Sequence, residues 1–331
     1  MPRSSAPRDL VAGLDIGGTK THLRIVDRHR TVLHDHVFPS DGWSATPVGP
    51  AARWVRHHLD EALAGLEGRL SAVAVGAQGC EQPAHCEELR AALEAGLRVP
   101  ATVVNDAELL LPAAGLDHGI TVIVGTGSIA VTTDTDGTML RAGGWGWVLS
   151  DDGSASALVR DAARAVLDGA DRGEPLGTLG ELLLASVSVP DVAALAHTLS
   201  WGNGPEHWGR HAPAVVAAAE RGSPAAQRVL ADGARSVAAL VRTLGRRGVD
   251  VHDVVFAGGL VTNVPAYWSA IRTRLEAAHP DCRPLLLDRP PVTGAVALAL
   301  RARPERGPGA AAAGRTEQPE DEQRRHGAGA Q

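Results

Sequence analysis

Lysine, cysteine and aromatic residues are scarce in this 331-residue sequence. Lys20 is the only lysine, so arginine carries nearly all of the positive charge. The three cysteines, Cys80, Cys86 and Cys282, are too few for a disulfide framework in a chain of this size, which predicts a protein of the reducing cytoplasm. Aromatic residues make up 3% of the chain, and most of them are tryptophan.

The sequence also lacks an excess of positive charge and any long hydrophobic run. Its 32 basic residues are outnumbered by 38 acidic ones, which gives a net charge of −6. A surface of that sign does not attract nucleic acid or anionic lipid by its bulk field. No apolar run is long enough to span a bilayer, and residues 10–14 are too short for a secretion segment. We therefore expect neither a nucleic-acid partner nor a membrane partner.

The rest of the composition is typical of a soluble globular protein, with 44% hydrophobic and 21% charged residues. The length predicts about two domains. Residues 1–9 are expected to form a flexible N-terminus. Residues 303–331 consist mainly of Gly, Ala, Pro, Arg, Glu and Gln without periodicity, which predicts a disordered tail.

One order of strands and helices occurs twice along the chain. Residues 11–38 predict three strands, and a helix, a buried strand, a helix and a strand follow up to residue 104, so the first unit has the order βββαβα. A second unit begins with the apolar strand at residues 120–124. Later signals are a hairpin at residues 134–137, a capped helix from Ser223-Pro224, a strand at 253–257 and a helix at 292–300.

This repetition predicts an α/β fold with two domains of one topology and a central cleft. We place the first domain at residues 10–117 and the second at residues 118–302. Each domain opens with a glycine-rich turn after its first strand, so the two turns face each other across the cleft. Backbone N–H groups in such turns can bind anions.

Asp15-Ile16-Gly17-Gly18-Thr19-Lys20 forms the first of these turns. Its glycines allow a tight turn and a close approach of the backbone to phosphate, while Thr19 and Lys20 can donate to phosphate oxygens. Asp15 can hold Mg²⁺ directly or through water. The alternative is a plain hairpin turn, because this is neither a Walker motif nor the spaced glycine pattern of dinucleotide folds.

Three further segments carry polar or glycine-rich signals. Asn105-Asp106 ends a strand where open α/β sheets bind ligands, although Asp106 could instead cap a helix that starts at Ala107. Residues 143–154 combine two tryptophans among glycines with Asp151 and Asp152, a composition suited to sugar, but either aspartate could cap the next helix. Gly258-Gly259 would let a flat ring such as adenine lie against the backbone; the alternative is a simple strand-to-helix turn.

In these segments the chain resembles the N-acetylglucosamine kinases and the related BadF/BadG-type ATPases of the sugar kinase/actin/heat-shock superfamily. The resemblance extends from about residue 10 to residue 300. It rests on Asp15 to Thr19, Asn105-Asp106, Gly125-Thr126-Gly127-Ser128 and the glycine-tryptophan block with Asp151-Asp152-Gly153-Ser154, all in the family's order. It implies two ribonuclease-H-like (actin-like ATPase) domains, ATP and Mg²⁺ as cofactors, a small sugar as substrate, and a homodimer.

The resemblance also implies a role for each matching position. Asp106 corresponds to the catalytic base that takes the proton from the sugar hydroxyl. The ATP contacts are implied at Gly17, Gly18, Thr19, Lys20, Gly125, Thr126, Gly127, Ala219, Gly258 and Gly259. The sugar contacts are implied at Asp41, Gly42, Asn105, Asp106, Ser128, Gly144, Trp145, Gly146 and Asp151.

Two positions depart from the family's pattern. Asp41 stands where the family usually has Asn, and Ile129 stands at a position that is often polar in the animal enzymes. A carboxylate at Asp41 could pair with a free amine, which makes glucosamine or another hexose an alternative to N-acetylglucosamine.

The leading hypothesis is an ATP-dependent kinase for the 6-hydroxyl of N-acetylglucosamine or glucosamine. A second is an ATPase that activates a dehydratase through a shared iron–sulfur cluster, for which Cys80 and Cys86 would have to lie at a subunit interface. We interpret the segment that contains these two cysteines as a substrate loop after a strand. A third hypothesis, a sugar-sensing regulator without catalysis, is disfavoured because the sequence has neither a helix-turn-helix arm nor a basic patch.

Overall fold

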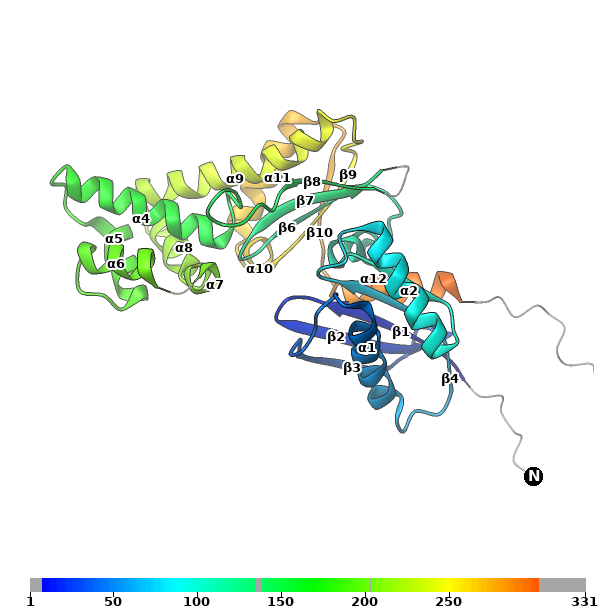
Figure 1. Ribbon diagram of the computed structural model, residues 1–331. Coiled ribbons are helices and arrows are strands. Elements are labelled where there is room, and N and C mark those ends of the chain that lie inside the picture. Colours follow the sequence, from blue (N-terminus) through cyan, green and yellow to red (C-terminus); the bar gives the residue numbers. More distant parts are fainter. Residues whose placement is uncertain (1–7, 135–137, 203, 304–331) are drawn as a thin grey trace, which may run out of the picture.

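The computed structural model describes residues 8–134, 138–202 and 204–303, and these form two α/β domains, each built on a five-stranded sheet (Figure 1). The first sheet has the order β3-β2-β1-β4-β5 and consists of β1 (Asp9–Ile16), β2 (Lys20–Asp27), β3 (Val32–Pro39), β4 (Arg69–Ala77) and β5 (Ala101–Val104). The second has the order β8-β7-β6-β9-β10 and consists of β6 (Ile120–Val124), β7 (Ser128–Thr133), β8 (Met139–Gly143), β9 (Asp253–Ala257) and β10 (Arg283–Leu286). The two orders are equivalent, which confirms the prediction of two α/β domains of one topology.

In both sheets the first three strands are antiparallel and the remaining strands are parallel to the first. β1 pairs antiparallel with β2 and parallel with β4, and β6 pairs antiparallel with β7 and parallel with β9. The carboxyl ends of the parallel strands therefore meet at one edge of each sheet, which is where open α/β sheets bind ligands.

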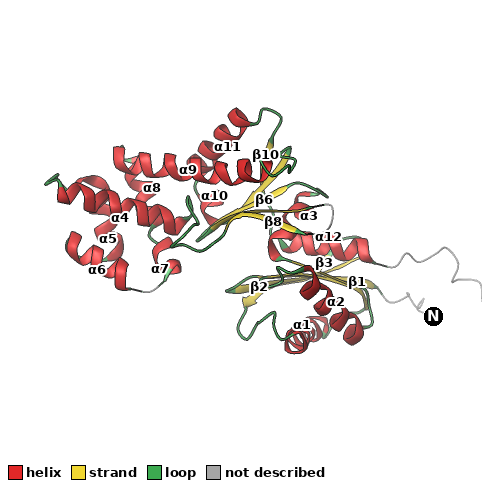
Figure 2. Ribbon diagram, turned by 45° about the horizontal axis from the view of Figure 1, so that its top comes forward, coloured by secondary structure: helices red, strands yellow, loops and turns green. Residues whose placement is uncertain are grey.

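Helices cover both faces of the first sheet (Figure 2). Alternate residues of β1 point to opposite faces, so Leu10 and Leu14 pack with α1 (Val48–Leu63) and α2 (Pro83–Leu97). Val11 packs on the other face with α12 (Val292–Ala302). Gly13 allows this close packing, because a Cβ there would lie 2.6 Å from the backbone nitrogen of Val296. The chain thus returns to the first domain at its last described helix, which we had placed in the second.

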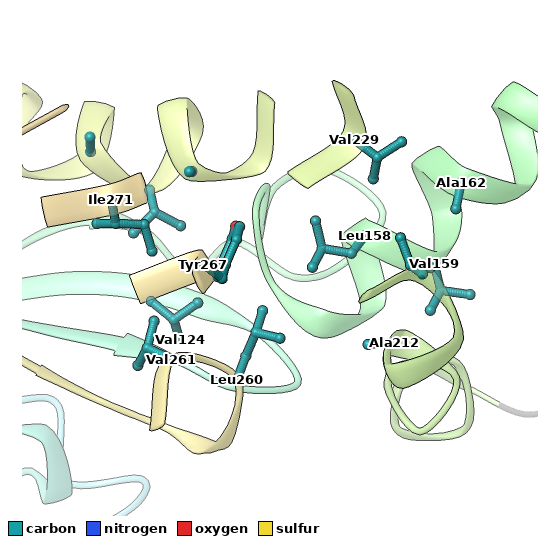
Figure 3. Close-up of a cluster of buried hydrophobic side chains, with 14 of the residues drawn as sticks. Val124, Leu158, Val159, Ala162, Ala212, Val229, Leu260, Val261, Tyr267 and Ile271 are labelled. Carbon is teal, nitrogen blue, oxygen red and sulfur yellow. The ribbon is translucent and has the colours of Figure 1, made fainter. Parts of the chain in front are cut away.

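The second domain carries a larger set of helices. These are α4 (Ala155–Asp171), α5 (Gly177–Val187), α6 (Val192–Trp201), α7 (Pro205–Gly209), α8 (Ala212–Glu220), α9 (Pro224–Gly245), α10 (Gly259–Asn263) and α11 (Pro265–Ala278). The α9 helix starts where the sequence predicts, with the Ser223 hydroxyl accepting from the backbone N–H of Ala226 at 3.4 Å. Tyr267 lies inside the core that these helices share with the second sheet, and its hydroxyl donates to the carbonyl of Gly153 at 2.7 Å (Figure 3).

The chain crosses between the domains twice. It leaves the first domain through the 3₁₀ helix η1 (Asp106–Leu109) and α3 (Leu110–Ala114), and it returns between β10 and α12. An ion pair of 2.6 Å joins Asp117 near the first crossing to Arg301 of α12. Within the described part of the chain, no single helix has both the length and the apolar character of a membrane span, and only the bent pair α5 and α6 meets those criteria jointly.

Some predictions fall on residues that the structure leaves undescribed. Residues 1–7, 304–331 and 135–137 lie outside the described residues. They include nearly all of the expected flexible N-terminus, the expected disordered tail and the centre of the expected hairpin. On either side of that centre, β7 and β8 pair antiparallel.

Candidate active site

A cavity of about 570 Å³ lies between the two domains. Residues 78–82, which follow β4, and residues 105–107 at the start of η1 line it from the first domain. The turn between β6 and β7, one face of the hairpin β7–β8 and the loop before α4 line it from the second domain. The cavity is thus formed where the carboxyl ends of the parallel strands of the first sheet face the second sheet.

Asn105 and Asp106 share the start of η1. Asn105 is the N-cap: its side-chain oxygen accepts from the backbone N–H of Ala107 at 3.1 Å, and Glu108 accepts from the backbone N–H of Asn105 at 3.2 Å. Together these bonds form a capping box. Asp106 also accepts from the Ala107 N–H, at 3.0 Å, but it belongs to the first turn of the helix and lines the cavity. The Asn105 side chain therefore fixes this turn, and Asp106 is held beside the cavity.

The capping box is connected to the opposite domain. The second carboxylate oxygen of Glu108 accepts from the hydroxyl of Thr133, at the end of β7, at 3.1 Å. One glutamate thus contacts both the backbone that carries Asp106 and a strand of the second sheet. A relative movement of the domains would therefore alter a contact that is connected to the start of η1.

The charge of Asp106, in η1, acts on the carboxyl group of Asp15, near the end of β1. Burial and, to a smaller extent, the negative charge of Asp106 together raise the pKa of Asp15 to about 7, while the positive charge of Lys20 opposes the shift. Burial also raises the pKa of Asp106, to which the Glu81 charge adds, while the backbone amide of Ala107 opposes it. Two poorly hydrated carboxylates close together favour a bound cation or a proton.

The first glycine turn lies next to the wall of the cavity. The backbone N–H of Gly17 donates to the carbonyl of Lys20 at 3.0 Å, which closes the turn between β1 and β2. Gly18 lies against Gln78, a lining residue, because a Cβ on Gly18 would be 2.5 Å from the Gln78 side-chain oxygen. Thr19 and Lys20 are exposed. The predicted turn is present, and a side chain larger than hydrogen at Gly18 would displace Gln78.

The second glycine turn lies within the cavity wall. The backbone N–H of Gly125 donates to the carbonyl of Gly127 at 2.9 Å, and both residues line the cavity. A Cβ on Gly127 would be 2.9 Å from a carboxylate oxygen of Asp151, so only glycine lets that carboxylate approach the turn. The buried Ser128 hydroxyl donates to the carbonyl of Asp152 at 3.0 Å, which ties the turn to the loop before α4.

Asp151 has an unusual backbone and an unsatisfied side chain. Its φ of 60° is left-handed, a conformation that Asp tolerates better than most residues. Burial raises the pKa of its carboxyl group, whereas the backbone amides of Ser128 and Gly146 lower it. Its Oδ1 atom is buried and has no hydrogen-bond partner among the residues that the structure describes. A buried acceptor of this kind at a cavity wall is suited to a hydrogen-bond donor from a ligand.

Neither Asp151 nor Asp152 caps α4, so that alternative is wrong. The cap is Ser154, whose fully buried hydroxyl accepts from the backbone N–H of Ala157 at 3.2 Å. Asp152 instead pairs with Arg160 at 2.6 Å. The Asp151 carboxylate is thus not used as a helix cap, and Asp151 lines the cavity.

The loop after β8 contributes backbone to the cavity. Gly144 and Gly146 line it and have left-handed φ values of 68° and 94°. Trp145, between them, is 62% exposed and is not a lining residue. Trp147 packs edge-on against Trp208, with ring centroids 4.9 Å apart. Trp147 therefore anchors the loop, while Trp145 lies between two lining glycines without lining the cavity itself.

A second cavity, of about 660 Å³, lies on the other side of the second glycine turn. Gly125 and Thr126 line both cavities, and Gly259 lines the second one. Two residues expected in the nucleoside pocket are placed elsewhere. Ala219 lies in the hydrophobic core, and Gly258 packs against the backbone of Val124. The neighbouring residues Val216, Ala217 and Glu220 of α8 line the cavity instead.

The predicted sugar loop stays outside the first cavity in this structure. Asp41 and Gly42 are exposed, and neither is a lining residue. The carbonyl of Asp41 accepts from the Trp54 indole at 3.1 Å, and the Trp43 indole donates to the carbonyl of Gln78 at 3.2 Å. The loop is thus adjacent to the cavity wall through Trp43.

Several lining residues were missed as individual positions. Glu81 and Gln82 belong to the segment that the sequence identified only as a substrate loop. Arg141, on β8, also lines the cavity, and no local motif marks it. Glu108 could have been found, because Asn105 followed three residues later by Glu is the pattern of a capping box.

Residues 12–299 match the sequence profile of the BadF/BadG/BcrA/BcrD ATPase family. The chain belongs to this family. It is 29% identical over 304 residues to the N-acetylmuramic acid/N-acetylglucosamine kinase of Clostridium acetobutylicum, an alignment that covers 87% of this chain and 97% of that protein. It is 23% identical to the N-acetyl-D-glucosamine kinase of Dictyostelium discoideum, with 89% and 99% of the two chains covered.

Solved structures have the same fold as this BadF/BadG/BcrA/BcrD family member. A protein of Chromobacterium violaceum assigned as an N-acetylglucosamine kinase superposes with a TM-score of 0.65 at 25% identity, covering 88% of this chain and 99% of that chain. A ROK-family glucokinase of Streptomyces griseus, solved with glucose and AMPPNP, superposes with a TM-score of 0.54 at 20% identity over the same shares. The predicted resemblance and the actin-like ATPase fold are therefore confirmed.

Proposed function

We propose that the protein is an ATP-dependent kinase that phosphorylates an amino sugar, N-acetylglucosamine or glucosamine, at its 6-hydroxyl. The observation that carries the proposal is the pair of cavities that share Gly125 and Thr126. A glycine turn with a cavity on each side suits a nucleotide on one side, a sugar on the other, and phosphates at the turn between them. The kinases named above, which align over most of this chain, support the same reaction.

Asp106 is the proposed general base. It lines the first cavity at the carboxyl end of β5, and burial raises its pKa, which makes it a better proton acceptor than an exposed aspartate. In this role it orients the acceptor hydroxyl and takes its proton as the phosphoryl group is transferred. Phosphoryl transfer otherwise depends on positioning and on stabilising charge. The contact between Glu108 and Thr133 would couple this residue to domain closure, which excludes water.

The residues present fit ATP and Mg²⁺. Burial and the charge of Asp106 raise the pKa of the partly buried Asp15 carboxyl group, so a divalent cation near it would stabilise its ionised form. Mg²⁺, when bound, would neutralise charge on the phosphates. Gly17 to Lys20 would contact those phosphates from the first domain and Gly125 to Gly127 from the second. The nucleoside would occupy the second cavity beside Gly259.

The sugar would occupy the first cavity. The partnerless Oδ1 atom of Asp151 accepts from a sugar hydroxyl or amide, which removes the cost of an unsatisfied buried acceptor. Asn105, Ser128, Gly144 and Gly146 line the same cavity. Asp41 and Gly42 would reach the sugar when their loop closes, and Trp145 would close over its apolar face.

The dehydratase-activator alternative is weaker. Cys80 is 1% exposed, and the Cys86 thiol donates to the carbonyl of Cys80 at 3.3 Å. These thiols are directed at the protein itself, whereas a shared cluster needs thiolates at a subunit interface. Iron analysis of the purified protein tests this alternative directly. A regulator that only senses sugar needs no general base, so the placement of Asp106 at the cavity favours the kinase over this alternative.

The decisive experiment is a coupled ADP-release assay with MgATP and five sugars: glucosamine, N-acetylglucosamine, glucose, mannosamine and N-acetylmuramic acid. We expect sugar-dependent ADP release with at least one amino sugar, and ³¹P NMR of the product should locate the phosphate on the 6-oxygen. ADP release that is independent of sugar would contradict the proposal. The cytoplasmic location and the homodimer are part of the same proposal, and light scattering of the purified protein measures the oligomeric state.

A further inference from the structure

Among the described residues that line the first cavity, Arg141 is the only basic one. The acidic lining residues are Glu81, Asp106 and Asp151. Arg141 forms no ion pair with any of them, nor with another carboxylate of the described chain. A guanidinium left unpaired in a cavity with three carboxylates is available to an anionic ligand.

Arg141 is held in place by its strand and by an aromatic ring. It lies on β8 opposite Val131 of β7, and both line the cavity from one face of this hairpin. The Arg141 carbonyl accepts from the Arg247 guanidinium at 2.8 Å. The Arg141 guanidinium carbon lies 4.0 Å from the centroid of the Trp145 ring, which orients the charge without neutralising it. The contact with Trp145 thus restrains the guanidinium, whose N–H donors lie along its edges and not on the face over the ring.

Arg141 lies outside the glycine turn at which the ATP phosphates are expected. The phosphates are expected at Gly125 and Thr126, which line both cavities, whereas Arg141 lines only the first. Asp106, where the acceptor hydroxyl is expected, belongs to the wall of the first domain, and Arg141 belongs to the wall of the second. The hydroxymethyl group and the C2–C3 edge lie at different ends of a pyranose ring, so a sugar with its 6-hydroxyl at Asp106 can direct that edge toward the second domain.

We propose that Arg141, backed by Trp145, is a subsite for a carboxylate carried by the sugar, and that the protein prefers acidic amino sugars such as a 3-O-carboxyalkyl N-acetylglucosamine. This inference rests on the proposed kinase function. Arginine suits the task because its planar fork donates two parallel hydrogen bonds to one carboxylate. The three lining carboxylates would repel such a substrate in the absence of Arg141, so this residue determines whether the acid is accepted.

The test compares N-acetylmuramic acid, its methyl ester and N-acetylglucosamine as substrates. N-acetylmuramic acid is N-acetylglucosamine with a lactyl ether at the 3-oxygen, and its methyl ester keeps the bulk without the charge. We expect kcat/KM to be highest for the acid, and Arg141→Met to lower that value by about 10- to 100-fold, the range for losing a hydrogen bond to a charged group. The same variant should change kcat/KM for N-acetylglucosamine by less than about threefold. Arg141→Lys, which keeps the charge without the fork, should fall between the wild type and Arg141→Met.

The controls separate this subsite from other roles. Arg235→Met removes an exposed arginine of α9 that is paired with Asp232, and it should leave all three substrates unchanged. An equal fall for acid and neutral sugars in Arg141→Met, with an unchanged melting temperature, would place Arg141 at the phosphates and overturn the proposal. So would an ester used as well as the acid by the wild type.

Direct binding distinguishes failure of the subsite from failure of the kinase function. If no sugar supports ADP release, the kinase proposal fails, and calorimetric titration with N-acetylmuramic acid still examines the subsite. Binding of the acid that is lost in Arg141→Met and kept in Arg235→Met would support the subsite by itself. Absence of binding, or binding that is insensitive to Arg141→Met, would overturn it.

Discussion

Asp106 is the residue at which helix geometry and proposed chemistry coincide. Its carboxylate accepts from the Ala107 N–H while Asn105 provides the cap. Asp106→Asn keeps a side-chain oxygen for that bond, so the thermal midpoint should stay close to that of the wild type. The amide cannot take a proton, so kcat should fall by about 10²–10⁴-fold. Melting curves and the coupled assay on one purified variant measure both effects.

Ligand binding provides the control for that substitution. The amide oxygen can still accept from the sugar hydroxyl, so sugar affinity should change little, and the phosphate turns are untouched. A variant that is folded, binds both ligands and turns over at a near-normal rate would rule out Asp106 as the base. Asp151 would then be the next carboxylate to substitute.

Asp15 should make the metal-free protein sensitive to pH. Its pKa of about 7 in the folded state lies above the ordinary value of 3.8 for an aspartate, so the folded chain keeps a proton that the unfolded chain has released. The free energy of unfolding therefore falls as pH rises from about 4 to about 7, by at most about 1.4 kcal/mol per pH unit from this group. Asp15→Asn removes this contribution, so its stability relative to the wild type should rise over that interval and stay constant above it. Urea unfolding at several pH values, with EDTA present, measures the difference, and parallel pH profiles would contradict it.

Several positions of the candidate site could be predicted because they lie at strand ends or in glycine turns. Asp15, Asp106 and Gly125 to Gly127 are of this kind. Ala219 could not be placed reliably, because one turn of α8 decides whether a side chain points to the core or to the cavity. Arg141 was not predicted because its strand has an ordinary alternating pattern. Only the pairing of β8 with β7 places this residue at the cavity.

At the scale of elements, the opening strands could be predicted because alternating apolar residues and glycine turns define them. β10 was missed. It is four residues long, contains a proline and, among the described strands, pairs only with β9, so its local pattern carries little strand signal. The helices between α4 and α9 were recognised only as helical stretches, because apolar alanines on several faces blur their periodicity. Such helices are defined by packing more than by pattern.

The contact between α12 and η1 depends on Gly294. A Cβ on this residue would overlap the carbonyl oxygen of Leu109. Gly294→Ala should lower the free energy of unfolding by about 1–3 kcal/mol, and it should also lower activity because η1 carries Asp106. Differential scanning calorimetry and the coupled assay measure these effects.

Gly49→Ala is the matched control, because Gly49 also lies in the first turn of its helix, α1, but is exposed. We expect Gly49→Ala to be neutral or to stabilise by up to about 1 kcal/mol. Similar melting temperatures for the two variants would show that α12 can shift away from η1 without cost.

At the scale of the molecule, α12 completes the first domain. It buries Ala295, Val296 and Ala299 against β1 and β4. A chain that ends at Pro291 leaves that face of the sheet exposed, so its thermal midpoint should fall by about 10 °C or more. A chain that ends at Arg303 should match the full-length protein in midpoint and turnover, because residues 304–331 have no large apolar side chains. Equal midpoints for the two truncations would show that α12 contributes little.

The return of α12 to the first sheet also sets the order in which the protein can fold during synthesis. The second sheet has all of its strands once residue 286 has left the ribosome. The first sheet has all of its strands much earlier, by residue 104, yet one of its faces stays uncovered until residues 292–302 emerge. The domain that is translated first is therefore the last to be finished, and its apolar face is exposed to chaperones and to other nascent chains throughout translation of the second.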